Sequence, residues 1–201
     1  MIASVPDLPL IADGGPPRER ADAARNRLRI LEAAAGLVGE RGIEHVSMED
    51  VACRAGVGTG TLYRRFGDRA GLALALLDEH TREFQDALIS GPPPLGPGAP
   101  ASERLAAFGE AYLELLERHA ELLVAAGATE RDGRGPYALY LTHLAILLGE
   151  CAPELDAPLT ARALLATLSP GQFLHARREL GWPIERMRSG WRAMIRALSA
   201  G

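Results

Sequence analysis

Apolar residues recur at intervals of three and four along most of the chain, which is the spacing of one face of an α-helix. In the first such stretch, Ile30, Ala34 and Leu37 share this spacing. We therefore predict a helix that begins at an N-cap residue, Asp22, and ends at Arg41. Later stretches predict further helices over residues 68–88, 102–126, 136–150, 159–180 and 183–199.

Single residues mark the ends of several of these helices. Asp68 is suited to cap the helix that follows it. Pro170 should kink or break the helix over residues 159–180, and Pro183 is expected at the first position of the last helix.

Two shorter helices are predicted between the first helix and residue 68. Ser47 and Asp50 have the spacing of a capping box, and the flanking Val46 and Val51 have that of a hydrophobic staple. This helix extends to Ala55, because the glycine that follows is a natural left-handed stop. A third helix then covers about residues 59–65.

The third helix has two unlike faces. Leu62 and Phe66 lie four residues apart and point inward, which turns Gly60, Tyr63 and Arg64 outward. Two short helices joined by a tight turn are typical of a helix-turn-helix, whose second helix lies in the DNA major groove. A glycine-rich phosphate cradle over residues 56–60 is the alternative, but it requires a preceding buried strand.

Composition supports an all-α chain. Of the 201 residues, 47% are apolar but only 5% are aromatic, and long Ala- and Leu-rich stretches favour helix over sheet. All 22 basic residues are Arg, which excludes a Schiff-base lysine and makes arginine responsible for every cationic contact. Residues 16–70 hold ten Arg and eight acids, whereas residues 71–201 hold twelve Arg and sixteen acids, a mild asymmetry that is weak evidence for a polyanionic partner.

The chain divides into three predicted parts. Residues 1–21 are expected to form a disordered tail, residues 22–67 a helix-turn-helix domain, and residues 68–201 a larger helical domain with a proline-rich loop at 91–101. The N-terminus lacks the pattern of a secretory signal, and the longest apolar stretch is far shorter than the roughly 20 residues that span a membrane. We expect a cytoplasmic protein.

The segment from Ser47 to Phe66, SMEDVACRAGVGTGTLYRRF, resembles the N-terminal domain of TetR-family transcriptional regulators over about residues 24–75. The resemblance implies a homodimeric, ligand-responsive DNA-binding protein, usually a repressor, that binds pseudo-palindromic operator DNA. By position, bases would be contacted by Thr59, Gly60 and Tyr63, and phosphates by Thr61, Arg64, Arg65 and Arg69, with Ser47 completing the DNA-binding set. Glu49 stands where some relatives direct a basic or polar residue toward DNA.

The larger domain is expected to hold the effector site. Its helix over residues 137–148 is apolar all round, which predicts a central position with burial on every side. Aromatic and histidine side chains of this helix and the preceding one are our candidates for a pocket that takes an apolar or aromatic effector, with plain core packing as the alternative. These candidates are Phe108, Tyr112, His119, Tyr137, Tyr140 and His143.

The last helices are expected to join two protomers, as the resemblance also implies. Residues 159–199 contain large apolar groups such as Trp191, Met194 and Ile195, more than the end of a monomer of this size is expected to cover. No metal, cofactor or catalytic motif is recognised, so we predict that the chain is not an enzyme. The main alternative function is a helical ligand-binding or scaffolding protein that has lost operator binding.

Overall fold

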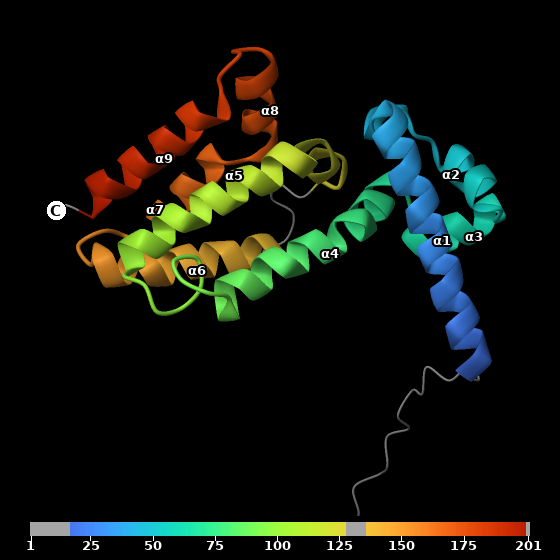
Figure 1. Ribbon diagram of the computed structural model, residues 1–201, viewed down its shortest axis with the longest axis horizontal. Helices are drawn as coiled ribbons and strands as arrows, with labels where there is room; N and C mark the ends of the chain where they lie inside the picture. The colour runs from blue at the N-terminus through green and yellow to red at the C-terminus, as the bar shows by residue number, and fades with distance from the viewer. Residues whose placement is uncertain (1–16, 128–135, 200–201) are drawn as a thin grey trace, which may run out of the picture.

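The computed structural model describes residues 17–127 and 136–199, and within these residues every regular element is a helix (Figure 1). The N-terminal elements are α1 (Pro17–Arg41), the short 3₁₀ helix η1 (Ile43–His45), α2 (Met48–Ala55) and α3 (Thr59–Phe66). They are followed by α4 (Arg69–Ser90), α5 (Ala101–Ala125), α6 (Pro136–Cys151), α7 (Ala157–Thr167), α8 (Pro170–Arg178) and α9 (Ile184–Leu198). The all-α prediction is confirmed.

The first helices close around a small apolar core. Ile30 and Leu37 of α1, Val51 of α2 and Leu62 of α3 are buried together. The predicted inward position of Leu62 and Phe66 is confirmed, since 0% and 9% of their surfaces are exposed. This core fixes α3 by one face only, so its other face is left to solvent.

Helix α4 belongs to both packed regions of the molecule. Asp68 caps it as predicted, because its carboxylate accepts a hydrogen bond from the Gly71 N–H at 2.9 Å. Leu72, in the first turn, is buried in the N-terminal core, whereas Phe84 and Leu88, further along, are buried in the C-terminal core. The chain therefore passes from one core to the other along a single helix (Figure 1).

Helix α5 is the centre of the C-terminal bundle and packs against α4, α6, α8 and α9. Trp191 of α9 is 1% exposed and donates its indole N–H to the Leu105 carbonyl at 2.9 Å. A Cβ atom on Gly109 would lie 2.1 Å from the Trp191 ring, so this ring fills a notch that only glycine leaves open. Carboxylates of α5 pair with arginines of α8 and α9, including Glu117 with Arg177 at 2.7 Å.

The prediction that the helix at 137–148 is buried on every side is wrong. In α6, Tyr140, Leu144 and Leu148 are buried, but Thr142 is exposed and 57% of the Ile146 surface is accessible. The helix lies between α5 and α7 and presents its remaining face to solvent. An apolar sequence indicated a central helix, but α5 occupies that position.

Two predicted helix starts need correction. Helix α1 begins at Pro17, so Asp22 lies inside it and pairs with Arg25 instead of capping, while residues 1–16 of the predicted tail lie outside the described residues. Pro183 occupies the N-cap position of α9, not the first helical position. The predicted break in the helix over residues 159–180 is confirmed, since α7 ends at Thr167 and Ser169 caps α8.

None of the helices within residues 17–127 and 136–199 has the length and hydropathy needed to cross a membrane. The proline-rich segment after α4 forms turns that return the chain to α5.

Candidate DNA interface and ligand site

The start of α2 is fixed by a reciprocal capping box. The Ser47 hydroxyl accepts a hydrogen bond from the Asp50 N–H, and the Asp50 carboxylate accepts one from the Ser47 N–H, both at 3.1 Å. Hydrogen bonds from Ser47 hold the pKa of Asp50 below its ordinary value, and Arg41 at 2.7 Å adds to that effect. The predicted cap is confirmed, and it engages the Ser47 hydroxyl, which is also a candidate for DNA contact.

The turn between α2 and α3 is set by glycine. Gly56 has φ of 62°, a left-handed conformation that a side chain disfavours, and its N–H bonds back to the end of α2. Gly58 then provides the N-cap position of α3 with extended backbone. The two helices with this turn form the predicted helix-turn-helix.

The outer face of α3 is polar and carries unpaired arginines. Gly60, Tyr63, Arg64 and Arg65 are exposed, and the two threonines of this helix, Thr59 and Thr61, are half-buried. Arg64 and Arg65 form no ion pair within the described part of the chain. A Cβ atom added at Gly60 would have no atom within 4 Å, so the backbone at this glycine is open to an approaching partner.

Several other arginines of the N-terminal region are already engaged. Arg54 binds Glu40 through two hydrogen bonds of 2.7 and 2.9 Å, which lower the pKa of Glu40 and raise that of Arg54. Arg69 donates to the Glu44 carbonyl at 3.2 Å, which ties the start of α4 to η1. Arg54 is therefore neutralised, whereas the carbonyl leaves the charge of Arg69 available to a partner, together with those of Arg64 and Arg65.

An acidic side chain shares this face. The Tyr63 hydroxyl lies 3.4 Å from Glu49 Oε1 of α2 and donates to it. The negative charge of Glu49 is the largest cause of a raised Tyr63 pKa. No sequence pattern indicates this contact, because residues 14 positions apart meet only when α2 and α3 pack together.

The predicted effector residues are partly brought together. Phe108, Tyr112 and Tyr140 are buried and pack with Phe84 of α4, with ring centroids 5.3 to 5.9 Å apart. Burial raises the pKa of both tyrosines. The rings form one aromatic cluster at the contact of α4, α5 and α6.

The remaining candidates lie around this cluster or away from it. The His143 ring is 6.2 Å from Phe108, and Tyr137 packs partly buried against the same core. His119 is separate from the cluster and stacks on His80 of α4 with ring centroids 4.4 Å apart. Among the residues that the structure describes, His143 Nε2 and Arg104 Nε are buried and have no hydrogen-bond partner, so this edge of the cluster has unused polar capacity.

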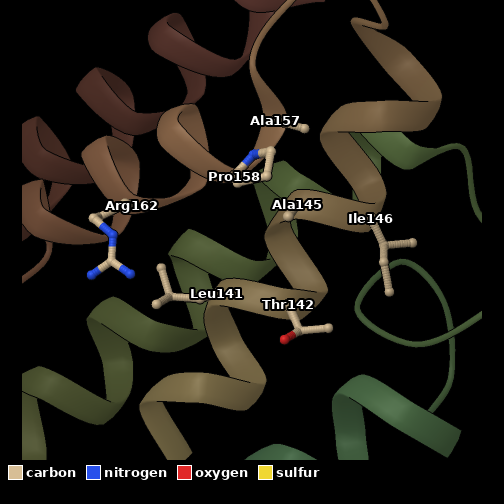
Figure 2. A pocket seen from close by; sticks show the side chains of 7 residues that line it. All are labelled: Leu141, Thr142, Ala145, Ile146, Ala157, Pro158 and Arg162. Atoms are coloured by element: carbon tan, nitrogen blue, oxygen red, sulfur yellow. The ribbon is translucent and has the colours of Figure 1, made fainter. Parts of the chain in front are cut away.

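A hollow of about 440 Å³ lies on the outer side of α6, where none of the predicted ligand residues is found. Figure 2 shows its lining side chains from α6 and α7, with the Arg162 guanidinium at one edge. The lining residues are Leu141, Thr142, Ala145, Ile146, Ala157, Pro158 and Arg162. We call this hollow the α6–α7 groove. In the described residues, no group of His, Cys, Asp and Glu has the arrangement of a metal site.

The N-terminal region is similar to known transcriptional regulators. Residues 30–76 match the profile of the family described as bacterial regulatory proteins, tetR family. The HTH-type transcriptional regulator SAB2452 of Staphylococcus aureus (strain bovine RF122 / ET3-1) is 42% identical over 65 residues, which are 32% of this chain and 35% of that protein. The HTH-type transcriptional regulator SAUSA300_2515 of Staphylococcus aureus (strain USA300) is 49% identical over 53 residues, 26% of this chain and 29% of that protein. The chain thus aligns with about a third of the length of these curated relatives.

Solved structures share the fold over most of the chain. The transcriptional regulator FadR from Bacillus subtilis, in complex with stearoyl-CoA, has a TM-score of 0.60 and 19% identity and covers 84% of this chain and 96% of its own. NalD, the secondary repressor of the MexAB-OprM multidrug efflux pump in Pseudomonas aeruginosa, has a TM-score of 0.56 and 21% identity and covers 87% and 95%. At these identities the likeness concerns the fold.

Proposed function

Because residues 30–76 form a helix-turn-helix domain of the TetR family, we propose that this chain is a ligand-responsive transcriptional regulator. It acts as a repressor that a small apolar or aromatic effector releases from its operator. The observation that carries the proposal is the outer face of α3, where Arg64 and Arg65 are exposed and unpaired within the described residues. Cations without intramolecular partners suit phosphate binding.

In the proposed complex, α3 enters the major groove and α2 crosses the backbone. Thr59, Gly60 and Tyr63 face bases, because they lie at the start and on the exposed side of α3. The residues that bind phosphates are Thr61, Arg64, Arg65 and Arg69. Ser47 lies at the edge of the interface.

The effector would bind in the C-terminal bundle beside the aromatic cluster. Phe108, Tyr112, Tyr137, Tyr140 and His143 remain the proposed lining, and His119 the outlying member. The unpartnered His143 Nε2 favours an effector that carries a polar group on an apolar body. A ligand in the α6–α7 groove would also press on the helix that carries Tyr140 and His143.

Two copies would associate through the exposed sides of α7 and α9. On α9, Gly190, Ala193, Met194 and Ala197 recur at helical spacing and are exposed, so a second helix could approach closely. Trp191 and Ile195 are buried inside one protomer and are not available to a second copy. Within residues 159–199, the large apolar side chains that are exposed and open to a partner are Leu159 of α7, Leu180 before α9 and Met194 of α9.

Signalling would pass along α4, which is packed in both cores. An effector that binds more tightly to the DNA-free spacing of the two recognition helices weakens operator binding, by about 1–3 kcal/mol in typical cases. Operator must then weaken effector binding by the same factor. Calorimetric titration of apolar compounds with and without operator measures that reciprocity, and equal affinities would exclude the switch.

The DNA-binding part is tested by the salt dependence of binding to double-stranded DNA. A dimer that neutralises about six to ten phosphates gives a slope of roughly −5 to −9 in log K against log salt, and a scaffolding protein gives none. Arg65→Ala should reduce the slope by about 2, because each protomer loses one phosphate contact. Arg118→Ala removes the same charge from α5 in the C-terminal bundle, where Arg118 is exposed and pairs with Glu114, and should leave the slope unchanged.

A further inference from the structure

Glu49 is an uncompensated carboxylate on the face that would meet DNA. It is exposed in the first turn of α2, next to Tyr63 on the outer side of α3. Tyr63 donates to Oε1, and no cation pairs with Glu49 among the residues that the structure describes. The second oxygen, Oε2, is free to accept another hydrogen bond.

Two other acids of this domain are paired with arginines. Glu40 is bound by Arg54, and Asp50 is bound by Arg41 and by the capping box. These pairs offset negative charge at the surface, whereas Glu49 keeps its charge next to the exposed Tyr63 of α3. A bare carboxylate repels phosphates, so this side chain lowers affinity for DNA in general.

The chemistry of the major groove offers one partner that suits it. Guanine presents two acceptors there, and thymine presents an acceptor and a methyl group, so both repel or ignore a carboxylate. Adenine has a donor amino group but places the N7 acceptor beside it. Cytosine presents the N4 amino group without an adjacent acceptor on its own edge, and a carboxylate accepts from it.

We propose that Glu49 is a specificity-determining residue that requires a cytosine at one position of each operator half-site and that Tyr63 holds its carboxylate in place. The hydrogen bond from Tyr63 orients Oε1, which leaves Oε2 to accept from the cytosine N4 amino group. The general repulsion then penalises sites without that amino group. This inference rests on the proposed operator binding.

The test is selection of binding sites from a randomised pool of double-stranded DNA by the purified full-length protein. The wild type should enrich a site with a cytosine at a fixed place in each half. Glu49→Gln keeps the shape of the side chain but replaces one acceptor oxygen by a donor amide, the group that pairs with adenine. We expect the enrichment of cytosine over the other bases at that position to be about tenfold lower for this variant, and adenine to be selected more often there.

Glu32→Gln is the matched control, because Glu32 is exposed on α1 of the same domain and removal of its charge leaves Tyr63 and Glu49 untouched. It should select the wild-type site. Tyr63→Phe removes the orienting hydroxyl and should weaken the cytosine preference in part. A Glu49→Gln variant that selects the wild-type site, even with higher overall affinity, would overturn the inference while operator binding stands. A wild type that enriches no sequence would overturn the proposed function itself.

Discussion

The guanidinium of Arg27 in α1 lies 3.8 Å from the carboxylate of Asp78 in α4. The same guanidinium is 5.7 Å from the centroid of the Phe66 ring, at the end of α3. One side chain therefore contacts both α3 and α4, the helix that leads into the bundle. Asp78 is also bound by Arg82 of α4 at 2.5 Å, which holds the carboxylate in position.

Replacing Arg27 should loosen the attachment of α1 and α3 to α4. Arg27→Met keeps an apolar stem but removes the ion pair with Asp78 and the contact with the Phe66 ring. Because the side chains of the ion pair are partly exposed, we expect the free energy of unfolding to fall by about 1 kcal/mol or less. Urea unfolding at low salt measures it. Arg25→Met is the control, because Arg25 pairs with Asp22 in its own helix. Equal effects of the two substitutions would show that the contact between helices contributes nothing.

The notch at Gly109 predicts opposite effects for two identical substitutions. Gly109→Ala places a Cβ 2.1 Å from the Trp191 ring and should destabilise the protein by about 1–3 kcal/mol through overpacking. Gly149→Ala, on an exposed position of α6 with no atom within 4 Å, should stabilise it by up to about 1 kcal/mol. Thermal unfolding distinguishes them, and a neutral Gly109→Ala would mean that α9 does not pack closely on α5.

Acid should destabilise the protein partly through His119. Burial, followed by the charges of His80 and Arg118, lowers the pKa of His119 in the folded state. In the unfolded chain a histidine takes up this proton near pH 6.5. The contribution of His119 to the free energy of unfolding is therefore full above that pH and is lost as the pH falls through the lower pKa of the folded state. His119→Gln should therefore lose less stability than the wild type between pH 7.5 and 5.5, as measured by urea unfolding.

His175→Gln is the comparison for that experiment, because His175 is an exposed side chain of α8 beside Glu179. It should not reduce the acid sensitivity. The assignment to His119 fails if the His175 variant alone becomes less sensitive to acid.

The proposed protomer contact predicts a dimer in sedimentation at micromolar concentration. Met194→Glu should weaken association at least tenfold, because a charge on α9 would be buried against the partner. Leu28→Glu makes the same kind of change at an exposed apolar position of α1 and should sediment as the wild type. If Met194→Glu also remains a dimer, two protomers associate elsewhere. Trp191→Glu is unsuitable here, since Trp191 lies inside the protomer and its replacement would unfold the chain.

Local sequence rules predicted the helix-turn-helix part of the fold closely. The Ser47 capping box, the Gly56 stop and the Asp68 cap are interactions between residues three or four positions apart, so their spacing in the sequence specifies them. The same rules misplaced the start of α1, because Asp22 is a suitable cap residue that lies in the second turn of a longer helix. A cap residue permits a helix to begin but does not force it.

Burial was less predictable, because it depends on which helices come together. An apolar side chain on a surface costs little, and Ile146 in α6 shows that a helix rich in leucine can keep an exposed face. Trp191 illustrates the reverse error, since sequence alone does not tell whether a large side chain packs in its own protomer or against a second copy. The contact between Glu49 and Tyr63 had no local signature for the same reason.

The contact between α9 and α5 has a consequence for the position of α4. Trp191, set into the notch at Gly109 and hydrogen-bonded to the Leu105 carbonyl, fixes the register of α9 on α5. If two copies meet through α9, this indole fixes α5 relative to the protomer contact. Because α4 packs on α5, the direction of α4 in each protomer is then fixed as well. The distance between the two copies of α3, which must match about 34–36 Å for binding to DNA, then depends on the packing at Gly109, which itself contacts no base.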